Sequence, residues 1–363
     1  MPTPKKPLEV SLAQSLARPT IADVARAAGV SKATVSRFLN HRDTLLTKDI
    51  ATRVEVAIAA LAYSPSPMAQ ALKRGRSRLI GLVVADVSNP FSVAVLRGAE
   101  KACQEAGYLL ILFNLGNDSQ RESEAIQALS AYQVEGFILN TLGGIAGAAA
   151  DVARQGKPVV LVDRRHQDIQ SDFVSLDNVG AVRLATRHLV EAGYHNLLFV
   201  SEPVRDVSSR QERETAFRNF ISESSAADSD PNSTLHGESF ENTAEDAEGL
   251  DRALIALRQR AGSGVPGVIS SNAVVTLRVV AALARLGWQL GRDIGLVGFD
   301  ETEWTPYIGP GLSTIAQPTH ELGRIAALCL IERLKGLDMP PRQILLSGQL
   351  VMRGSSKPVV VAG

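Results

Sequence analysis

Polar side chains follow several apolar runs of this sequence, at the places where strands of a parallel sheet are expected to end. Carboxylates and amides hydrogen-bond to hydroxyl groups, and an aromatic face packs against a sugar ring or a carbon chain. An arginine adds a bidentate partner for a carboxylate. The pattern therefore favours a binding site for a polyhydroxylated small molecule. The residues in these positions are Asp86, Asn89, Phe91, Asn140, Asp163, Arg164, Asn272 and Asp300.

The elements that must position these side chains are short, apolar and β-branched, and they alternate with helical stretches. Residues 81–84 (Gly-Leu-Val-Val) show no polar alternation, which is typical of a strand buried on both faces of a parallel sheet. So many strand–helix units exceed one typical sheet, and we expect two doubly wound lobes with a ligand cleft at the carboxyl ends of their strands. The predicted strands are residues 79–85, 109–113, 136–139, 158–162, 196–200, 265–269 and 294–299.

Other stretches predict little chemistry. Residues 223–246 are rich in Ser, Asp, Glu and Asn, and we expect an exposed loop with little regular structure there. Cys103 and Cys329 lie far apart in apolar, helix-like segments, so we expect buried thiols and no disulfide. Without CxxC or HExxH spacing among the two cysteines and six histidines, no metal site is expected.

The strongest local signal is residues 20–40, which have the pattern of two short helices joined by a glycine turn. Thr20 and Asp23 form a capping-box pattern. Gly29 suits a left-handed turn, and Ser31 can cap the second helix. This predicts a helix-turn-helix whose second helix enters the DNA major groove. The alternative is a helical hairpin within an ordinary bundle.

The charge distribution favours the DNA-binding interpretation. The whole chain has no net charge, but residues 1–78 hold 13 Lys and Arg against 5 Asp and Glu. A basic first fifth on an acidic body suggests a nucleic-acid-binding head, with a solvated basic tail as the alternative. Arg37 is the best candidate for a bidentate guanine contact, and Lys32 and Ala33 would tune sequence choice.

Residues 20–40 resemble the signature of the lactose/galactose repressor family of bacterial regulators at nearly every position. The resemblance continues through 63–72 (Tyr-Ser-Pro-Ser-Pro-Met-Ala-Gln-Ala-Leu), 89–91 (Asn-Pro-Phe) and 297–300 (Val-Gly-Phe-Asp), and it covers nearly the whole chain. It implies an N-terminal all-α helix-turn-helix head on an α/β periplasmic-binding-protein-like core of two doubly wound parallel-sheet lobes. It also implies a homodimer on double-stranded, near-palindromic operator DNA, with the chain crossing between its lobes three times.

The resemblance further implies a hinge helix that folds only when two protomers sit side by side on the operator. Leu72 occupies the position of a leucine that wedges into the minor groove, although taken alone it fits a helix-packing role better. Family hinges commonly carry Asn and a non-proline residue where this chain has Ser66 and Pro67, which leaves open how far hinge folding depends on DNA. The DNA-contacting residues expected are Thr20, Ser31, Lys32, Ala33, Thr34, Ser36, Arg37, Asn40, Ala69 and Leu72.

For the effector, the resemblance places Arg210, Asn272, Asp300 and Gln317 at positions where family members contact their ligands. It places Phe240 where some members have a stacking aromatic, and Trp304 near the cleft mouth. Residues 300–312 and 45–47 look like members that sense gluconate-type and keto-sugar acids, so a sugar acid is favoured over a neutral sugar or a purine. The expected effector-binding residues are Asp86, Asn89, Phe91, Asn140, Arg164, Arg210, Phe240, Asn272, Asp300, Trp304 and Gln317.

Several function classes are disfavoured. We find no GxSxG or GxxxxGK[ST] motif and no GxGxxG after the first strand, and we expect neither an enzyme nor a cofactor. No apolar run approaches the roughly 20 residues that span a bilayer. The first residues lack a signal-peptide pattern, which favours a cytoplasmic protein over a periplasmic sugar-binding protein. The absence of a leucine-heptad tail favours a dimer over a tetramer.

These patterns predict an organisation in five parts. They are a disordered lead at 1–18, a helix-turn-helix domain at 19–63, a linker with a hinge helix at 64–78, a two-lobed effector-binding and dimerisation domain at 79–354, and a tail at 355–363. The first lobe is expected at about 79–176 and 318–345, and the second at about 178–316 and 346–354.

Overall fold

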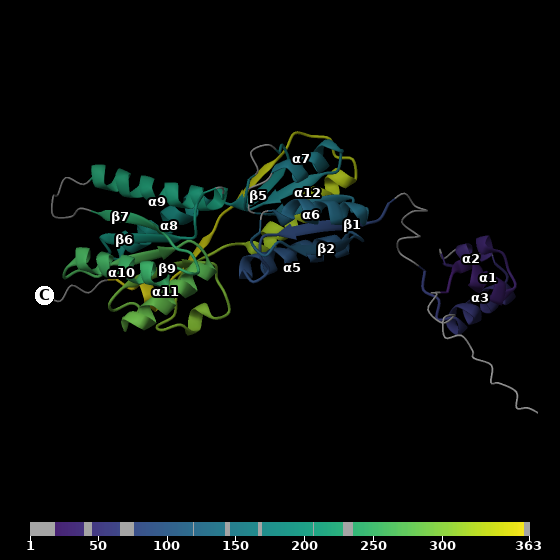
Figure 1. The fold of residues 1–363 in the computed structure, drawn as a ribbon, viewed down its shortest axis with the longest axis horizontal. Coiled ribbons are helices and arrows are strands. Elements are labelled where there is room, and N and C mark those ends of the chain that lie inside the picture. The colour runs from purple at the N-terminus through teal and green to yellow at the C-terminus, as the bar shows by residue number, and fades with distance from the viewer. Residues whose placement is uncertain are drawn as a thin grey trace, which may run out of the picture. The chain divides into compact units, whose positions relative to one another are not determined.

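The computed structural model describes residues 19–39, 46–65, 76–118, 120–141, 146–165, 169–205, 207–227 and 235–358. The chain forms two compact units, Met1–Ser77 and Arg78–Gly363 (Figure 1).

The first unit contains a helix-turn-helix, as predicted. Within the described residues its helices are α1 (Ile21–Ala28), α2 (Lys32–Leu39) and α3 (Lys48–Ala60). The Thr20 backbone N–H donates to the Asp23 carboxylate at 2.9 Å, which fixes the start of α1. Gly29 ends α1 with φ +63°, a left-handed conformation that suits glycine. The three helices enclose a small core of Val24, Ala25, Ala28, Val35, Val54 and Ala57.

The second unit contains two six-stranded sheets, each the centre of one lobe. The N-lobe sheet has the order β11-β5-β4-β3-β1-β2 and is parallel throughout. The C-lobe sheet has the order β12-β10-β9-β8-β6-β7 and is parallel except for β12. The strands are β1 (Leu79–Val84), β2 (Leu109–Asn114), β3 (Gly136–Asn140), β4 (Val159–Val162), β5 (Asp172–Leu176), β6 (Asn196–Ser201), β7 (His236–Glu241), β8 (Gly267–Ser270), β9 (Gly295–Phe299), β10 (Ser313–Ala316), β11 (Gln343–Leu346) and β12 (Gln349–Val351).

Helices cover both faces of each sheet, because the strands carry apolar side chains on both faces and each face must be shielded from water. In the N-lobe, α5 (Pro90–Glu105) and α12 (Thr319–Leu334) share one core, and α6 (Arg121–Ala131) and α7 (Ala146–Arg154) lie on the other side. In the C-lobe, α8 (Asn178–Glu191) and α9 (Ser208–Ala227) lie opposite α10 (Ala247–Ala261) and α11 (Ala273–Leu286) (Figure 1). Two short 3-10 helices, Thr305–Tyr307 and Gly354–Ser356, complete the C-lobe.

The pair α5 and α12 packs unusually closely because glycines face the contact. A Cβ atom on Gly98 would lie 1.9 Å from the His320 carbonyl oxygen, and one on Gly323 would lie 2.0 Å from the Val95 carbonyl oxygen. No larger residue fits at either position without moving a helix backbone.

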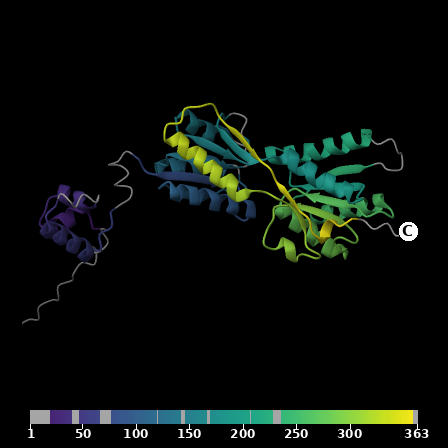
Figure 2. The same ribbon diagram turned by 180° about the vertical axis from the view of Figure 1, so that it is seen from behind.

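The chain passes between the lobes three times, from β5 to α8, from β10 to α12 and from β11 to β12 (Figure 2). Each passage leaves one sheet near the carboxyl end of a parallel strand. The lobes therefore face each other across the edge where open α/β sheets bind ligands.

The fold confirms the predicted class, with two differences in detail. The loop expected at 223–246 is wrong, since α9 continues to Ala227 and β7 occupies His236–Glu241. This strand lies at the sheet edge with alternating exposure, so its polar composition resembles that of a loop. Strands β5, β10, β11 and β12 were not predicted. Cys103 and Cys329 are buried free thiols, as expected.

Candidate functional site

Helix α2 presents most of its predicted DNA-reading residues to solvent. Lys32, Ala33 and Arg37 are exposed, whereas Thr34 and Ser36 are half-buried. The Ser31 hydroxyl accepts the Thr34 backbone N–H at 3.1 Å and so caps the helix. The exposed side chains can reach base edges and phosphates, while Ser31 and Thr34 also shape the start of the helix.

Arg53 on α3 binds the turn that joins α1 and α2. Its guanidinium donates to the Ala28 carbonyl oxygen at 3.0 Å from Nε and 2.6 Å from Nη2, and to the Gly29 carbonyl oxygen at 3.0 Å. These carbonyls end α1, where a cation is favoured by the helix dipole. The sequence interpretation missed Arg53, because its partners lie about 25 residues away in the chain.

A cavity between the lobes of the second unit gathers eight of the predicted effector residues. From the N-lobe come Asn89, Phe91, Asn140 and Arg164, and from the C-lobe come Arg210, Asn272, Asp300 and Gln317. Asp163, Ser209, Arg213 and Ser271 complete its lining. We call this cavity the cleft. Its free volume is about 30 Å³, room for one or two waters. A six-carbon ligand therefore requires the lobes to separate or the lining side chains to move.

Arg213 lies at the centre of the cleft. Its side chain is 6% exposed and lies 4.5 Å over the ring of Phe299. Nε donates to Asn178 Oδ1 at 2.8 Å, and Nη2 donates to Gln317 Oε1 at 3.3 Å. Burial lowers the pKa of the Arg213 guanidinium, and the carboxylate of Asp163 opposes that shift. The cleft therefore holds a buried positive charge in a fixed orientation.

Asp300 faces Arg213 from the end of β9. Its Oδ1 accepts from Gln317 Nε2 at 2.6 Å, and its Oδ2 accepts from the Ala273 backbone N–H at 2.9 Å. Burial raises the pKa of the Asp300 carboxyl, and the charge of Arg213 works against that shift. Asp300 thus links the start of α11 to the crossover that carries Gln317.

Asp163 and Arg164 follow β4 and bring two unsatisfied polar atoms to the cleft. Arg164 Nε and Asp163 Oδ1 are both buried and make no hydrogen bond to any residue that the structure describes. Arg164 Nε lies 3.4 Å from Asp163 Oδ2, and Ser209 Oγ donates to that oxygen at 3.2 Å. Buried polar atoms that make no hydrogen bond are rare. They are therefore candidates for contact with a ligand.

Arg210 and Asn272 are joined by Glu202. The Glu202 Oε2 atom accepts from Arg210 Nη2 at 2.6 Å and from Asn272 Nδ2 at 2.9 Å. Asn272 also caps α11 by accepting the Val275 backbone N–H at 2.9 Å. Glu202 therefore neutralises Arg210 and holds Asn272 in one orientation.

Each of the two units matches a known protein family. Residues 20–66 match the family model described as bacterial regulatory proteins of the lacI family, and residues 186–356 match the periplasmic binding protein-like domain. The chain is 45% identical over 349 residues to the HTH-type transcriptional regulator PtxS of Pseudomonas plecoglossicida, covering 96% of this chain and 99% of that protein. This chain belongs to the lacI family. It is a DNA-binding transcriptional regulator.

Two further comparisons extend over nearly the whole chain. The HTH-type transcriptional regulator KdgR of Bacillus subtilis is 36% identical over 336 residues, which cover 93% of this chain and 97% of that protein. The lac repressor dimer bound to operator and the anti-inducer ONPF matches with a TM-score of 0.77 and 23% identity, covering 94% of this chain and all of that one. The structural match shows a shared fold.

Three residues predicted for this lacI-family cleft do not line it. Asp86 accepts from Ser88 and Asn117 and so orders its own loop. Phe240 and Trp304 pack against the core that α10 and α11 share with the C-lobe sheet. Asn40, Ala69 and Leu72, together with Ser66 and Pro67 of the hinge, lie outside the described residues.

The sequence interpretation singled out Arg210 but missed Arg213, Ser209 and Ser271. One signal was available for Arg213, because it follows Arg210 by one helical turn and must share a face with it. Ser209 and Ser271 have no signal in the sequence, since serines follow strands and begin helices throughout this chain.

The described residues contain neither a membrane-crossing helix nor a metal-binding cluster. No helix there has both the length and the apolar character to cross a membrane. The same residues contain no cluster of three or more His, Cys, Asp and Glu side chains suited to a metal ion.

Proposed function

We propose that this regulator is a repressor that a sugar acid, such as gluconate or a ketogluconate, releases from its operator. The observation that carries the proposal is the chemistry of the cleft. Arg164, Arg210 and Arg213 line it, and the Arg164 Nε–H is buried without a hydrogen-bond acceptor among the described residues. Arginine is the side chain that binds carboxylates bidentately, and the amides and aspartates beside it suit hydroxyl groups.

The resemblance of residues 300–312 and 45–47 to members that sense sugar acids supports the same ligand class. We infer that the carboxylate would contact Arg164 or Arg213. Asp163 Oδ1 would then accept a hydroxyl hydrogen, because it too makes no hydrogen bond within the described residues. The remaining predicted contacts, Asn89, Phe91, Asn140, Asn272 and Asp300, stay proposals.

A neutral sugar is the second candidate, and one observation favours it. Three carboxylates lie close to the three arginines, since Asp163 and Asp300 line the cleft and Glu202 binds Arg210. The formal charge of this set is zero, which would also accommodate an uncharged ligand. The ribose operon repressor of Escherichia coli, 30% identical over 340 residues, carries a neutral sugar in its name.

Matched ligands separate the two candidates. Fructose is 2-ketogluconate with a hydroxymethyl group in place of the carboxylate, and glucitol bears the same relation to gluconate. We would titrate the purified chain calorimetrically with both pairs and with 2-keto-3-deoxygluconate, glucose, ribose and a purine base. Binding of an acid at least tenfold tighter than its neutral partner supports the proposal. Equal or tighter binding of the neutral partner, or no binding of any acid, refutes it.

We further propose that the protein acts as a homodimer that presents two helix-turn-helix heads to two half-sites. Exposed apolar side chains on both lobes suit an interface between copies. On the edge strand β2, Leu109 is 66% exposed, and on α11 Leu277 is 46% exposed. Sedimentation of the variant carrying L109E and L277E should show monomers where the wild type sediments as a dimer.

Small-molecule control follows from thermodynamic linkage. A ligand that prefers one lobe arrangement weakens operator binding only if the operator-bound dimer prefers the other arrangement. Operator DNA must then weaken effector binding by the same factor.

A further inference from the structure

The first turn of α9 is where the C-lobe meets the loop that follows β4 of the N-lobe. The Arg165 backbone N–H donates to Ser208 Oγ at 2.8 Å, and its Nε lies 3.6 Å from Glu212 Oε1. The side chains of Arg165 and Glu212 are 40% and 34% exposed. This ion pair joins the two lobes, as do the hydrogen bond from Ser209 to Asp163 and the three chain passages.

Arg165 is fixed on its own lobe as well. Its guanidinium lies 4.1 Å over the ring of Phe173 in β5, and Nη1 donates to Gln343 Oε1 in β11 at 3.4 Å. The position of Arg165 therefore follows the N-lobe when the lobes move.

Glu212 uses its two carboxylate oxygens for different partners. Oε1 faces Arg165 of the N-lobe, and Oε2 accepts from Asn178 Nδ2 at 2.8 Å. The amide oxygen of Asn178 in turn accepts from Arg213 Nε at 2.8 Å inside the cleft. Two hydrogen bonds thus connect the inter-lobe ion pair to Arg213 in the cleft.

We propose that Glu212 is a positioning residue through which the arrangement of the lobes sets the orientation of Arg213. An amide has a donor end and an acceptor end, and Glu212 fixes which end of Asn178 faces Arg213. When the lobes separate, Arg165 leaves Glu212 and the constraint on Asn178 weakens. Arg213 Nε then loses its fixed hydrogen-bond acceptor, while Nη1 still donates to the Ser271 carbonyl oxygen. The inference rests on the proposed function in taking Arg213 as part of the effector site.

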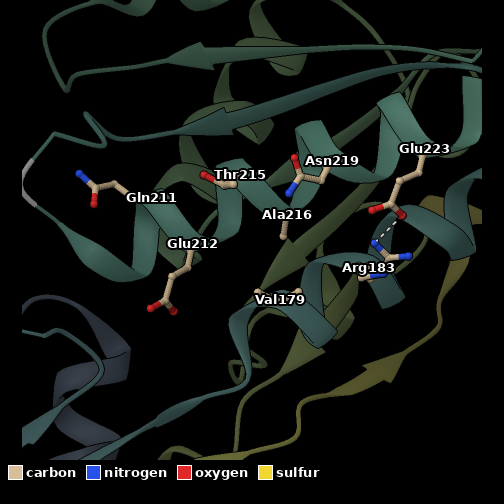
Figure 3. Close-up of a pocket in the computed structure, with 8 residues that line it drawn as sticks. All are labelled: Val179, Arg183, Gln211, Glu212, Thr215, Ala216, Asn219 and Glu223. Carbon is tan, nitrogen blue, oxygen red and sulfur yellow. Dashed lines mark hydrogen bonds and ion pairs between the residues drawn. The ribbon is translucent and has the colours of Figure 1, made fainter. Parts of the chain in front are cut away.

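The chain supplies a matched control. Glu212 lies on α9 beside a groove of about 430 Å³ that separates this helix from α8, and the Arg183–Glu223 ion pair lies further along the same groove (Figure 3). Arg183 Nη1 and Glu223 Oε2 are 2.8 Å apart, and their side chains are 35% and 57% exposed. This pair has similar exposure but joins two helices of one lobe, so its loss should leave Arg213 unchanged.

The first test needs no ligand. The Arg213 Nε–H resonance of the perdeuterated full-length protein would be assigned by its disappearance in R213K. We expect R165M and E212Q to shift this resonance and to speed its exchange with water at least about fivefold, whereas R183M changes neither. An unchanged resonance in R165M, or an equal change in R183M, would overturn the proposal. Thermal melts establish that each variant is folded, and R165M decides the matter if E212Q is not.

The second test uses calorimetric titration with 2-ketogluconate. Dissociation constants should rise about two- to fivefold in R165M and in E212Q, since the pair is part-exposed. The double variant should be no weaker than either single one, and R165K should recover part of the loss. Additive losses would overturn the proposal. If the wild type does not bind 2-ketogluconate, the sugar-acid assignment fails, while the resonance of Arg213 still decides the role of Glu212.

Discussion

Replacing Asp300 by asparagine removes one charge and one acceptor from the cleft with almost no change in shape. Both oxygens of Asp300 accept a hydrogen bond, one from Gln317 and one from the start of α11. The backbone at Asp300 has φ +73°, a conformation that asparagine tolerates and alanine does not. In D300N, one of these two N–H donors must therefore face the new amide nitrogen. The substitution adds no backbone strain, because asparagine tolerates the positive φ.

The cost can be estimated from these contacts. Loss of one hydrogen bond to a charged, buried acceptor costs about 1.5–3 kcal/mol. For a unit of this size that corresponds to a fall of roughly 2–5 °C in melting temperature. Affinity for the effector should fall at least about tenfold, because the cleft loses an ionised acceptor beside Arg213. Affinity for the operator without effector should stay within about twofold of the wild type.

Scanning calorimetry, effector titration and operator binding by fluorescence anisotropy measure the three quantities. The control is D251N, which disturbs an ion pair 2.7 Å long between Asp251 and Arg285 on the helices α10 and α11. That variant should respond to the effector as the wild type does. A D300N protein with wild-type melting temperature and wild-type effector affinity would refute the assignment of Asp300 to the cleft chemistry.

Three further predictions concern other parts of the chain. Arg37→Ala should weaken specific operator binding by about 1–3 kcal/mol and leave effector binding intact, and a normal footprint would remove Arg37 from the reading residues. Burial raises the pKa of Glu122 to about 7 from an ordinary 4.5. The contribution of the Glu122 carboxyl to the free energy of unfolding is therefore fully present below about pH 4.5 and is lost as the pH rises through about 7. Hence E122Q should raise the free energy of unfolding by about 3 kcal/mol at pH 8 and by little at pH 5. Equal gains at both pH values in urea titrations would contradict this. Burial alone would raise the pKa of Asp172, but hydrogen bonds from Arg333 and Arg342 hold it well below its usual range. D172N removes the negative charge that both guanidiniums share and puts an amide N–H donor against one of them. It should cost about 3–5 kcal/mol in urea denaturation, and a loss under about 1 kcal/mol would contradict that role.

The parts of the fold that local sequence signals determine were predictable. The cap at Thr20, the turn at Gly29 and the cap at Ser31 lie within a dozen residues, and each works through its immediate neighbours. The continuous apolar strands were predictable for a similar reason, since burial on both faces leaves a composition that few other elements share. Strand β7 has one exposed face at a sheet edge and lacks that composition.

The location of the cleft was predictable from the sequence, but the hydrogen bonds within it were not. Polar residues at the ends of parallel strands gather at the carboxyl edge of each sheet, and the facing edges of the two lobes bring Asn140 and Arg164 into one cleft with Asp300. Which arginine becomes buried depends on how the two lobes meet. Arg213 bonds to Asn178 and Gln317, partners 35 and 104 residues away. No spacing rule along the chain connects such residues.

Release of the operator by an acidic sugar tests the central claim most directly. The assay is fluorescence anisotropy of labelled operator DNA with the full-length protein at fixed salt, titrated in parallel with 2-ketogluconate and with fructose. We predict that 2-ketogluconate lowers operator affinity at least tenfold at concentrations where fructose has no effect. Unchanged operator affinity with 2-ketogluconate, or equal release by fructose, would contradict a regulator whose cleft recognises the carboxylate of a sugar acid.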